Sequence, residues 1–306
     1  MAYICTLIFR FMDFTGDFMQ RSYLILIGGA EDKTGNREIL KQTVKISGAK
    51  SIVVIPTASA YPRDVFTDYY YAFKELGVEQ IECFDIRKPE EADTERNLEL
   101  IRTTDLVFFS GGDQVKLVET LKDSQLLKII KERFYSGTLP IAGTSAGAAA
   151  ASDYMLYDGD YKGFMKGAVT HTRGFGFIEN ITVDTHFLHR ERIPRLVDVL
   201  SSPEIPNTKG IGLDENTAIV IGPNLRMWTI GSGMVTVINT EFVTFSDYDS
   251  IEKNSVFSIN NLRIGFLAPG TMFSTKRWSV LKSDEAKKKF SEMTPEHYSY
   301  LNMILN

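Results

Sequence analysis

The segment best suited to covalent chemistry is Gly143–Gly147, with the sequence GTSAG. It fits the pattern G-x-S-x-G, in which a serine stands on a sharp turn between a strand and a helix. A short apolar run ends at Ala142, and four alanines follow from Ala148. Small neighbours permit the turn, and a helix N-terminus would point its amides at a reacting carbonyl. The pattern predicts Ser145 as a nucleophile; the alternative is a tight turn capped by serine.

A serine nucleophile needs a base, and the chain has four histidines. His186 ends an apolar stretch, where a strand would deliver it to the carboxyl edge of a sheet, so it is the favoured base. The alternative is a hydrogen-bonded structural histidine. We expect His171 in a glycine-rich loop, His189 at the start of a helix and His297 in a charged tail.

A carboxylate should orient the base, and the segment Gly210–Asn216 offers two. Asp214 and Glu215 stand between an apolar segment and a predicted strand. One would face inward and the other solvent, and their order alone does not choose between them. The alternative is a solvated acidic pair, since acids mostly stay exposed.

The scaffold for these residues is predicted from continuous apolar runs of strand length. Such runs indicate strands buried on both faces, as in a parallel sheet covered by helices. Three intervening segments, 36–47, 64–76 and 124–135, have helical length and spacing. The pattern predicts an α/β fold: a doubly wound, mostly parallel sheet with helices on both faces. The five predicted strands are 23–27, 51–55, 80–84, 105–109 and 139–142.

The two ends of the chain differ from this pattern. After Thr217 the apolar runs shorten and alternate, which predicts antiparallel strands and a β-rich C-terminal part from about residue 226. The tail from Ser283 is charged and predicted helical. We expect residues 1–22 to be an extension and 23–306 to form a single catalytic domain. The apolar stretch 1–12 is interrupted by arginine and makes a poor signal peptide, which favours a cytoplasmic protein.

Composition narrows the function. The 306 residues carry 34 Lys and Arg against 39 Asp and Glu, a formal charge of −5, and hydrophobic residues make up 43%. These values fit a globular protein and argue against a nucleic-acid binder. Cys5 and Cys83 are too isolated for a disulfide framework or a zinc site. No run reaches 18 apolar residues, so no membrane span is predicted. We expect no metal and no cofactor.

Several blocks together resemble the cyanophycinase family, which is related to the aspartyl dipeptidases. They are GTSAGA around Ser145, DxHFxxRxRxxRL from Asp184 to Leu196, GxGxDE at 210–215, GGDQ at 111–114 and GGAEDK at 28–33. The matches run from about residue 24 to 222. The resemblance implies a serine peptidase on a flavodoxin-like sheet, similar to that of class I glutamine amidotransferases.

The resemblance also implies roles for individual residues. Ser145 would be the nucleophile, His186 the base and Glu215 the orienting acid. The oxyanion hole would combine the amide of Ala146 with one from the turn at Gly112 and Asp113.

The substrate implied by the resemblance is cyanophycin, a polyaspartate chain with arginine on each side-chain carboxyl, or a related isoaspartyl or aspartyl dipeptide. Cyanophycinases release β-aspartyl-arginine dipeptides. Substrate carboxylates favour arginine, whose planar fork binds them bidentately. The family pattern often has glutamine where this chain has Thr185, whose hydroxyl cannot make the same amide contacts. The expected substrate-binding residues are Gln114, Asp184, Thr185, Arg190, Arg192 and Arg195.

Two other functions stay open from the residues. An esterase-like α/β-hydrolase has the chain order serine, acid, histidine, and Asp153, Asp158 and Asp160 lie between Ser145 and His186. A non-enzymatic binding protein on the same scaffold is the other alternative. For the three arginines, the alternative to substrate binding is a solvated basic face. We expect a peptide substrate as partner, no nucleic acid or membrane, and a homodimer as the assembly to test.

Overall fold

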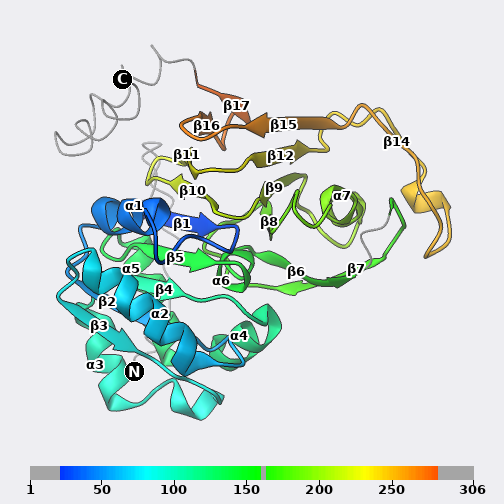
Figure 1. The fold of residues 1–306 in the computed structure, drawn as a ribbon. Coiled ribbons are helices and arrows are strands. Elements are labelled where there is room, and N and C mark those ends of the chain that lie inside the picture. The colour runs from blue at the N-terminus through cyan, green and yellow to red at the C-terminus, as the bar shows by residue number, and fades with distance from the viewer. Residues whose placement is uncertain (1–20, 160–162, 282–306) are drawn as a thin grey trace, which may run out of the picture.

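The computed structural model describes residues 21–159 and 163–281. Most of the predicted N-terminal extension, Asp160 and the tail from Ser283 lie outside these residues. Two sheets organise the described chain, one of nine strands and one of four, and they lie side by side (Figure 1). Two short hairpins complete the strands, β6 (Tyr154–Gly159) with β7 (Val169–Arg173) and β13 (Phe245–Ser246) with β14 (Ile259–Asn260).

Five parallel strands form one half of the large sheet, in the order β3-β2-β4-β5-β1. Each predicted strand is confirmed to within about two residues. The first strand lies beyond the fifth, and the other four keep the relative order of the first four strands of flavodoxin. The bounds are β1 Leu24–Ile27, β2 Ser51–Ile55, β3 Gln80–Cys83, β4 Leu106–Phe109 and β5 Ile141–Thr144.

The other half of the large sheet is antiparallel and continues outward from β1. Where two neighbouring strands of this half are also consecutive in the chain, a short turn such as the one at 222–225 joins them, and a short turn permits an antiparallel neighbour without a crossover. The sheet is therefore mixed and not mostly parallel as predicted. The strands are β10 (Thr217–Ile221), β11 (Arg226–Gly231), β16 (Met272–Ser274) and β17 (Ser279–Val280).

Helices cover both faces of the parallel half. Ile25 and Ile27 pack with α1 (Glu38–Ser47) and α2 (Pro62–Glu75) on one face. Leu24 and Leu26 point to the opposite face because side chains alternate along a strand. The helices on that face are α3 (Glu95–Thr103), α4 (Gln114–Leu121) and α5 (Gln125–Tyr135), with a short helix η1 (Pro89–Glu91) before α3.

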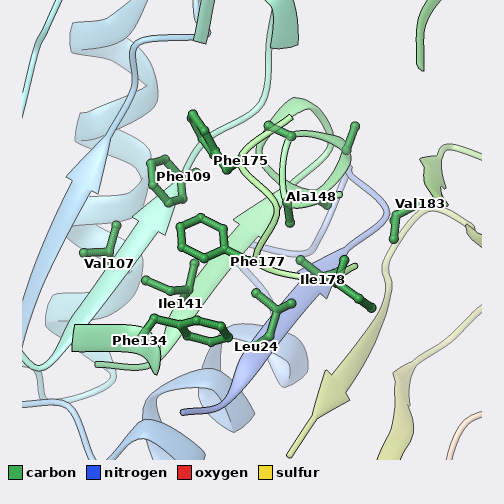
Figure 2. Packing of buried hydrophobic residues seen from close by; sticks show 14 of the residues in the cluster. Leu24, Val107, Phe109, Phe134, Ile141, Ala148, Phe175, Phe177, Ile178 and Val183 are labelled. Carbon is green, nitrogen blue, oxygen red and sulfur yellow. The ribbon is translucent and has the colours of Figure 1, made fainter. Parts of the chain in front are cut away.

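An aromatic cluster fixes the loop that follows β7 against this second face (Figure 2). The ring centroids of Phe109 and Phe175 are 5.4 Å apart, and those of Phe134 and Phe177 are 5.3 Å apart. All four side chains are buried. Truncating a buried phenylalanine to alanine typically costs about 3–5 kcal/mol, so the cluster gives the end of β4 a rigid support.

The four-stranded sheet has the order β15-β12-β9-β8, and β8 runs parallel to β9. Helix α7 (Ile193–Ser201) packs on it, and a missing side chain makes room: a Cβ on Gly210 would lie 2.8 Å from the side chain of Leu200 in this helix. The strands are β8 (Ile181–Thr185), β9 (Lys209–Leu213), β12 (Val235–Asn239) and β15 (Arg263–Leu267), with the short helix η2 at Tyr248–Ser250.

Two local expectations were wrong. His171 lies in strand β7 and not in a loop, because residues 169–173 pair with β6 despite the nearby glycines. His189 does not begin a helix: residues 187–191 form turns and α7 starts at Ile193, next to Pro194 in its first turn. Proline is favoured at this position because its fixed φ suits a helix start and its missing amide is not needed there.

Candidate active site

The G-x-S-x-G segment forms the predicted elbow between strand β5 and the short helix α6 (Ala146–Ala149). Ser145 has φ 51° and ψ −110°, a sparsely populated conformation that costs on the order of 1–3 kcal/mol. The glycines are required by close packing. A Cβ on Gly143 would lie 2.6 Å from the carbonyl carbon of Gly147, and one on Gly147 would lie 2.4 Å from the backbone oxygen of Phe109.

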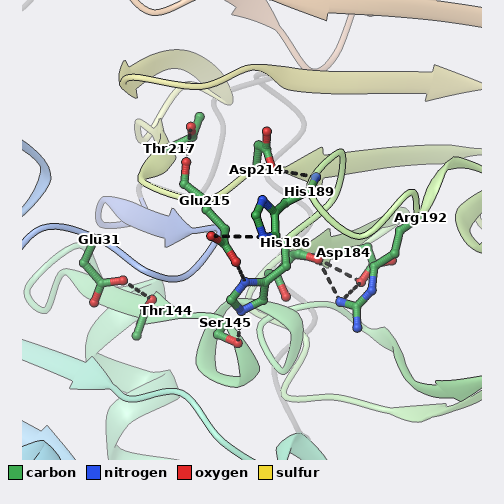
Figure 3. Close-up of polar contacts among 11 residues, drawn as sticks. Glu31, Thr144, Ser145, Asp184, His186, His189, Arg192, Asp214, Glu215 and Thr217 are labelled. Carbon is green, nitrogen blue, oxygen red and sulfur yellow. Dashed lines mark hydrogen bonds and ion pairs between the residues drawn. The ribbon is translucent and has the colours of Figure 1, made fainter.

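Ser145, His186 and Glu215 form a continuous line of polar contacts (Figure 3). The hydroxyl oxygen of Ser145 lies 2.9 Å from Nε2 of His186, and Nδ1 of His186 lies 2.7 Å from Oε1 of Glu215. Asp214 has a different contact: its carboxylate accepts the backbone N–H of His189 at 3.0 Å. The structure therefore brings Glu215, and not its neighbour, to the imidazole.

The end of β1 and the loop after it hold all three parts of this line through their backbone. The consecutive carbonyls of residues 27–29 accept the N–H groups of Ser145, His186 and Asn216, at 2.9, 2.9 and 2.8 Å in that order. Asn216 directly follows the glutamate. A Cβ on Gly29 would lie 2.4 Å from the His186 ring, so the loop backbone packs directly against the imidazole. One short segment thus sets the relative position of three distant chain regions.

Two backbone amides are available beside the serine. The loop after β4 approaches it closely: a Cβ on Gly111 would lie 3.2 Å from the Cβ of Ser145. Among the residues that the structure describes, the amides of Gly112 and Ala146 donate to no protein group. An amide at a helix N-terminus has no partner within its helix, which accounts for Ala146 at the start of α6. Since neither amide is bound to a protein group, both are available to an oxygen on the substrate.

The amide of Asp113 is not available, which corrects one of the expected oxyanion-hole residues. Its N–H donates to the carbonyl of Ala58 at 2.9 Å. Its side chain caps α4 by accepting the N–H of Lys116 at 3.0 Å. Gly112, with φ 139°, makes this contact possible, because a Cβ there would lie 2.2 Å from the Ala58 oxygen.

The site's electrostatics keep the imidazole neutral. Burial lowers the pKa of His186 below its usual value, and the positive charges of Arg190 and Arg192 lower it further. The hydrogen bond to Glu215 acts against these effects but does not outweigh them. The same hydrogen bond is the main reason why the pKa of Glu215 is lowered, so the glutamate stays ionised. A neutral imidazole beside an ionised carboxylate is the state that can accept a proton from a hydroxyl.

Asp184 and Arg195 pair with each other inside the protein. Their side chains are 2% and 4% exposed, and Arg195 Nε lies 3.1 Å from an oxygen of Asp184. Arg192 adds an ion pair to Asp184 at 3.4 Å and donates to the carbonyl of Thr185 at 2.8 Å. We therefore reassign Asp184 and Arg195 from substrate contact to structural support, because their charges already neutralise each other.

The other expected substrate-binding residues differ in accessibility. Arg190 is exposed in the turn after His186, and its charge acts on the imidazole. Gln114 is half-buried and donates its side-chain amide to the carbonyl of Leu156 at 2.9 Å. Thr185 is only 4% exposed. Arg190 is thus the expected residue best placed to meet a ligand.

The acids that a serine, acid, histidine order would use lie elsewhere. Asp153 accepts the side-chain amide of Asn207 at 2.8 Å. Asp158 is exposed and accepts the N–H of Gly159. Asp160 lies outside the described residues. Neither described acid contacts His186, whereas Glu215 does, and it follows the histidine in the chain.

Residues 21–159 and 163–281 contain no group of three or more His, Cys, Asp or Glu side chains arranged to hold a metal ion. In the same residues, no helix is long and apolar enough to cross a membrane. Cys83 is a free thiol whose pKa burial raises to about 11.

The elbow serine, the imidazole and the carboxylate define the class of site found in serine-type hydrolases. The model of peptidase family S51 matches residues 24–224, so this chain belongs to that family and is a serine-type peptidase. Two cyanophycinases are similar to it. The one from Trichormus variabilis is 33% identical over 264 residues, covering 85% of this chain and 88% of that protein. The one from Geminocystis herdmanii is 31% identical, covering 84% and 94%.

A solved structure agrees on the fold. The peptidase from an acI-B1 actinobacterium superposes with a TM-score of 0.62 at 24% identity, covering 84% of this chain and 98% of that chain. At this identity the likeness concerns the fold alone. It supports the α/β architecture with a large mixed sheet described above.

Proposed function

We propose that this peptidase hydrolyses β-aspartyl-linked peptides, cyanophycin foremost, through an acyl-enzyme on Ser145. The observation that carries the proposal is the line of contacts from the Ser145 hydroxyl through His186 to Glu215, at 2.9 and 2.7 Å. Both distances lie within the range needed for proton transfer between a nucleophile and its base.

The chemistry follows from these positions. As the Ser145 oxygen attacks the substrate carbonyl carbon, its proton passes to Nε2 of His186. The substrate carbonyl oxygen becomes negative and accepts hydrogen bonds from the backbone amides of Gly112 and Ala146, which are fixed in place before the reaction. His186 then gives the proton to the leaving amine as the C–N bond breaks, which leaves an ester on Ser145. Water, activated by the same imidazole, hydrolyses that ester and restores the serine.

The substrate class rests on the relatives and on one exposed charge. The similar curated proteins are cyanophycinases. Every repeat of cyanophycin carries a carboxylate and a guanidinium near the bond to be cut. Arg190 is exposed close to His186 and can bind such a carboxylate through its planar fork. The family pattern often has glutamine where this chain has Thr185. Because of this difference, related β-aspartyl dipeptides are the alternative substrates.

Mass spectrometry of products tests the proposal. The protein is incubated with cyanophycin, with β-Asp-Leu and with a simple ester, and Ser145→Ala is the matched control. We expect β-Asp-Arg from cyanophycin, and a fluorophosphonate adduct on Ser145 in the wild-type protein alone. Cleavage of the ester but of neither peptide would contradict the proposal and indicate an esterase. A wild-type protein that neither turns over nor accepts the label would point to a binding protein.

A further inference from the structure

Glu31 is a buried acid next to the elbow that the proposed mechanism does not use (Figure 3). It follows the glycines after β1 and is 3% exposed. One carboxylate oxygen accepts the Thr144 hydroxyl at 2.6 Å, and the other accepts the hydroxyl of Tyr69. The ammonium of Lys33 lies 3.8 Å from the carboxylate. Thr144 is the residue that directly precedes the nucleophile.

Both hydroxyls act as donors here. An ionised carboxylate only accepts hydrogen bonds, and bonds to an ionised group are stronger than neutral ones. Burial, followed by the charge of Glu31, raises the pKa of Tyr69 well above its usual value, so the phenol keeps its proton. A buried carboxylate is costly unless such partners satisfy it. The three side chains thus form a tight, directional cluster.

We infer that Glu31 is a positioning residue, which fixes the elbow through the hydroxyl of Thr144; the inference rests on the proposed role of Ser145. The segment that leads into its loop, residues 27 and 28, supplies the carbonyls that hold Ser145 and His186. The Glu31–Thr144 bond ties that loop by a side chain to the strand that presents the nucleophile. The strained conformation of Ser145 persists only if its surroundings over-determine it, and this bond is one such constraint.

The chain offers a matched control in Asp198. This acid is 2% exposed and likewise accepts a buried tyrosine hydroxyl, that of Tyr248 at 3.1 Å. It also accepts the backbone amides of Gly167 and Val169. It lies in α7, and none of its hydrogen bonds involves the proposed triad. Asp198→Asn therefore removes a similar buried charge without touching the elbow.

The test compares Thr144→Val, which keeps the shape but removes the hydroxyl, with Thr144→Ser, which keeps the hydroxyl. Fluorophosphonate labelling of Ser145, kcat, KM and melting temperature are measured for each. We expect Thr144→Val to lower the labelling rate and kcat about tenfold or more with KM within about twofold, since small misplacements cost rate rather than binding. Thr144→Ser should stay within about threefold of wild type. Glu31→Gln should lose about as much kcat as Thr144→Val, and the double variant should be little slower than either single variant.

Each other outcome has a defined meaning. Equal rates for Thr144→Val and Thr144→Ser, or for Thr144→Val and wild type, would overturn the positioning role. So would an equal loss of kcat in Asp198→Asn and Glu31→Gln, which would indicate a general effect of removing a buried charge. A wild-type protein without labelling would instead refute the proposed function, so the two failures are distinguishable. If Glu31→Gln does not fold, the threonine pair alone decides.

Discussion

The two sheets contribute to the site in different ways. The large sheet presents Ser145 after β5 and the amide of Gly112 after β4, using small residues, close backbone contacts and a strained turn. The four-stranded sheet presents His186 after β8 and Glu215 after β9, and their geometry depends on polar side-chain contacts. Backbone packing thus dominates at the nucleophile, where the Glu31–Thr144 hydrogen bond adds to it, whereas hydrogen bonds and charge act at the base together with the backbone of Gly29. Variants on the two sides should fail in different ways.

The largest effects are expected at the nucleophile and its base, one from each sheet. Ser145→Ala should lower kcat by about 10³–10⁶, because the covalent step disappears. His186→Ala should lose a similar amount, and the double variant should be little worse than either single one. Steady-state kinetics with unchanged circular dichroism would check this. Near-wild-type turnover by Ser145→Ala would contradict a serine nucleophile at the end of β5.

A smaller loss is expected at the acid that follows β9 on the four-stranded sheet. Glu215→Gln keeps the shape but removes the charge that stabilises the protonated His186, so kcat should fall by about 10²–10⁴. Asp214→Asn is the control, since that acid accepts only the His189 amide among its hydrogen bonds in the described structure. Equal losses in both variants would mean that the two acids are not distinguished as the geometry indicates.

The buried ion pair should respond in stability. Arg195→Ala leaves the carboxylate of Asp184 buried with one of its two arginines gone, and breaking a buried pair typically costs about 3–5 kcal/mol. Urea unfolding measures the loss, and the kinetics of the folded fraction should be unchanged. A lower kcat/KM with an unchanged free energy of unfolding would instead mean that Arg195 contacts the substrate.

Arg190 should respond in binding. Arg190→Ala should raise KM or lower kcat/KM for a carboxylate-bearing substrate about tenfold, or about 1.4 kcal/mol, with the unfolding midpoint unchanged. Arg190→Lys should recover part of this, because lysine keeps the charge but lacks the fork. Wild-type kinetics in Arg190→Ala would place carboxylate recognition elsewhere.

The smallest effect concerns pH. The base must be neutral, and burial lowers the pKa of His186, so kcat/KM should rise with pH through an apparent pKa below the usual 6.5 and then level off. The glutamate hydrogen bond raises that pKa. The residual activity of Glu215→Gln should therefore have its acid limb at a lower pH. An acid limb above pH 7 in the wild-type protein would contradict this electrostatic account.

Local patterns pointed to two of the three residues that the structure brings together in the proposed catalytic line, because each of the two has a local signature. Ser145 is marked by flanking glycines and a preceding apolar run, and His186 by its place at the end of another run. The choice of Glu215 over Asp214 followed from the family resemblance; spacing alone left it open. The structure separates them through one turn, in which Asp214 binds a backbone amide.

Long-range partners could not be predicted in this way. Glu31 and Thr144 are 113 positions apart, and nothing local marks the acid as buried. All three arginines were predicted to bind substrate, and the sequence did not indicate which one is structural; Arg195 is buried against Asp184, whereas Arg190 is exposed. Antiparallel strands after Thr217 were predicted, but not that they extend the large sheet, because apolar continuity indicates burial but not which strand lies beside β1.

The carbonyls of residues 27–29 have a consequence for how this chain tolerates changes in length. Three partners are bonded to three successive peptide groups, so inserting or deleting one residue here would shift at least two of the bonds out of step together. Among the described hydrogen bonds, the turn at 222–225 is tied to one distant region, through the N–H and hydroxyl of Thr275 on the carbonyl of Leu225, so a change in its length disturbs fewer parts of the molecule. We therefore expect this scaffold to tolerate insertions better at its outer turns than at residues 27–29.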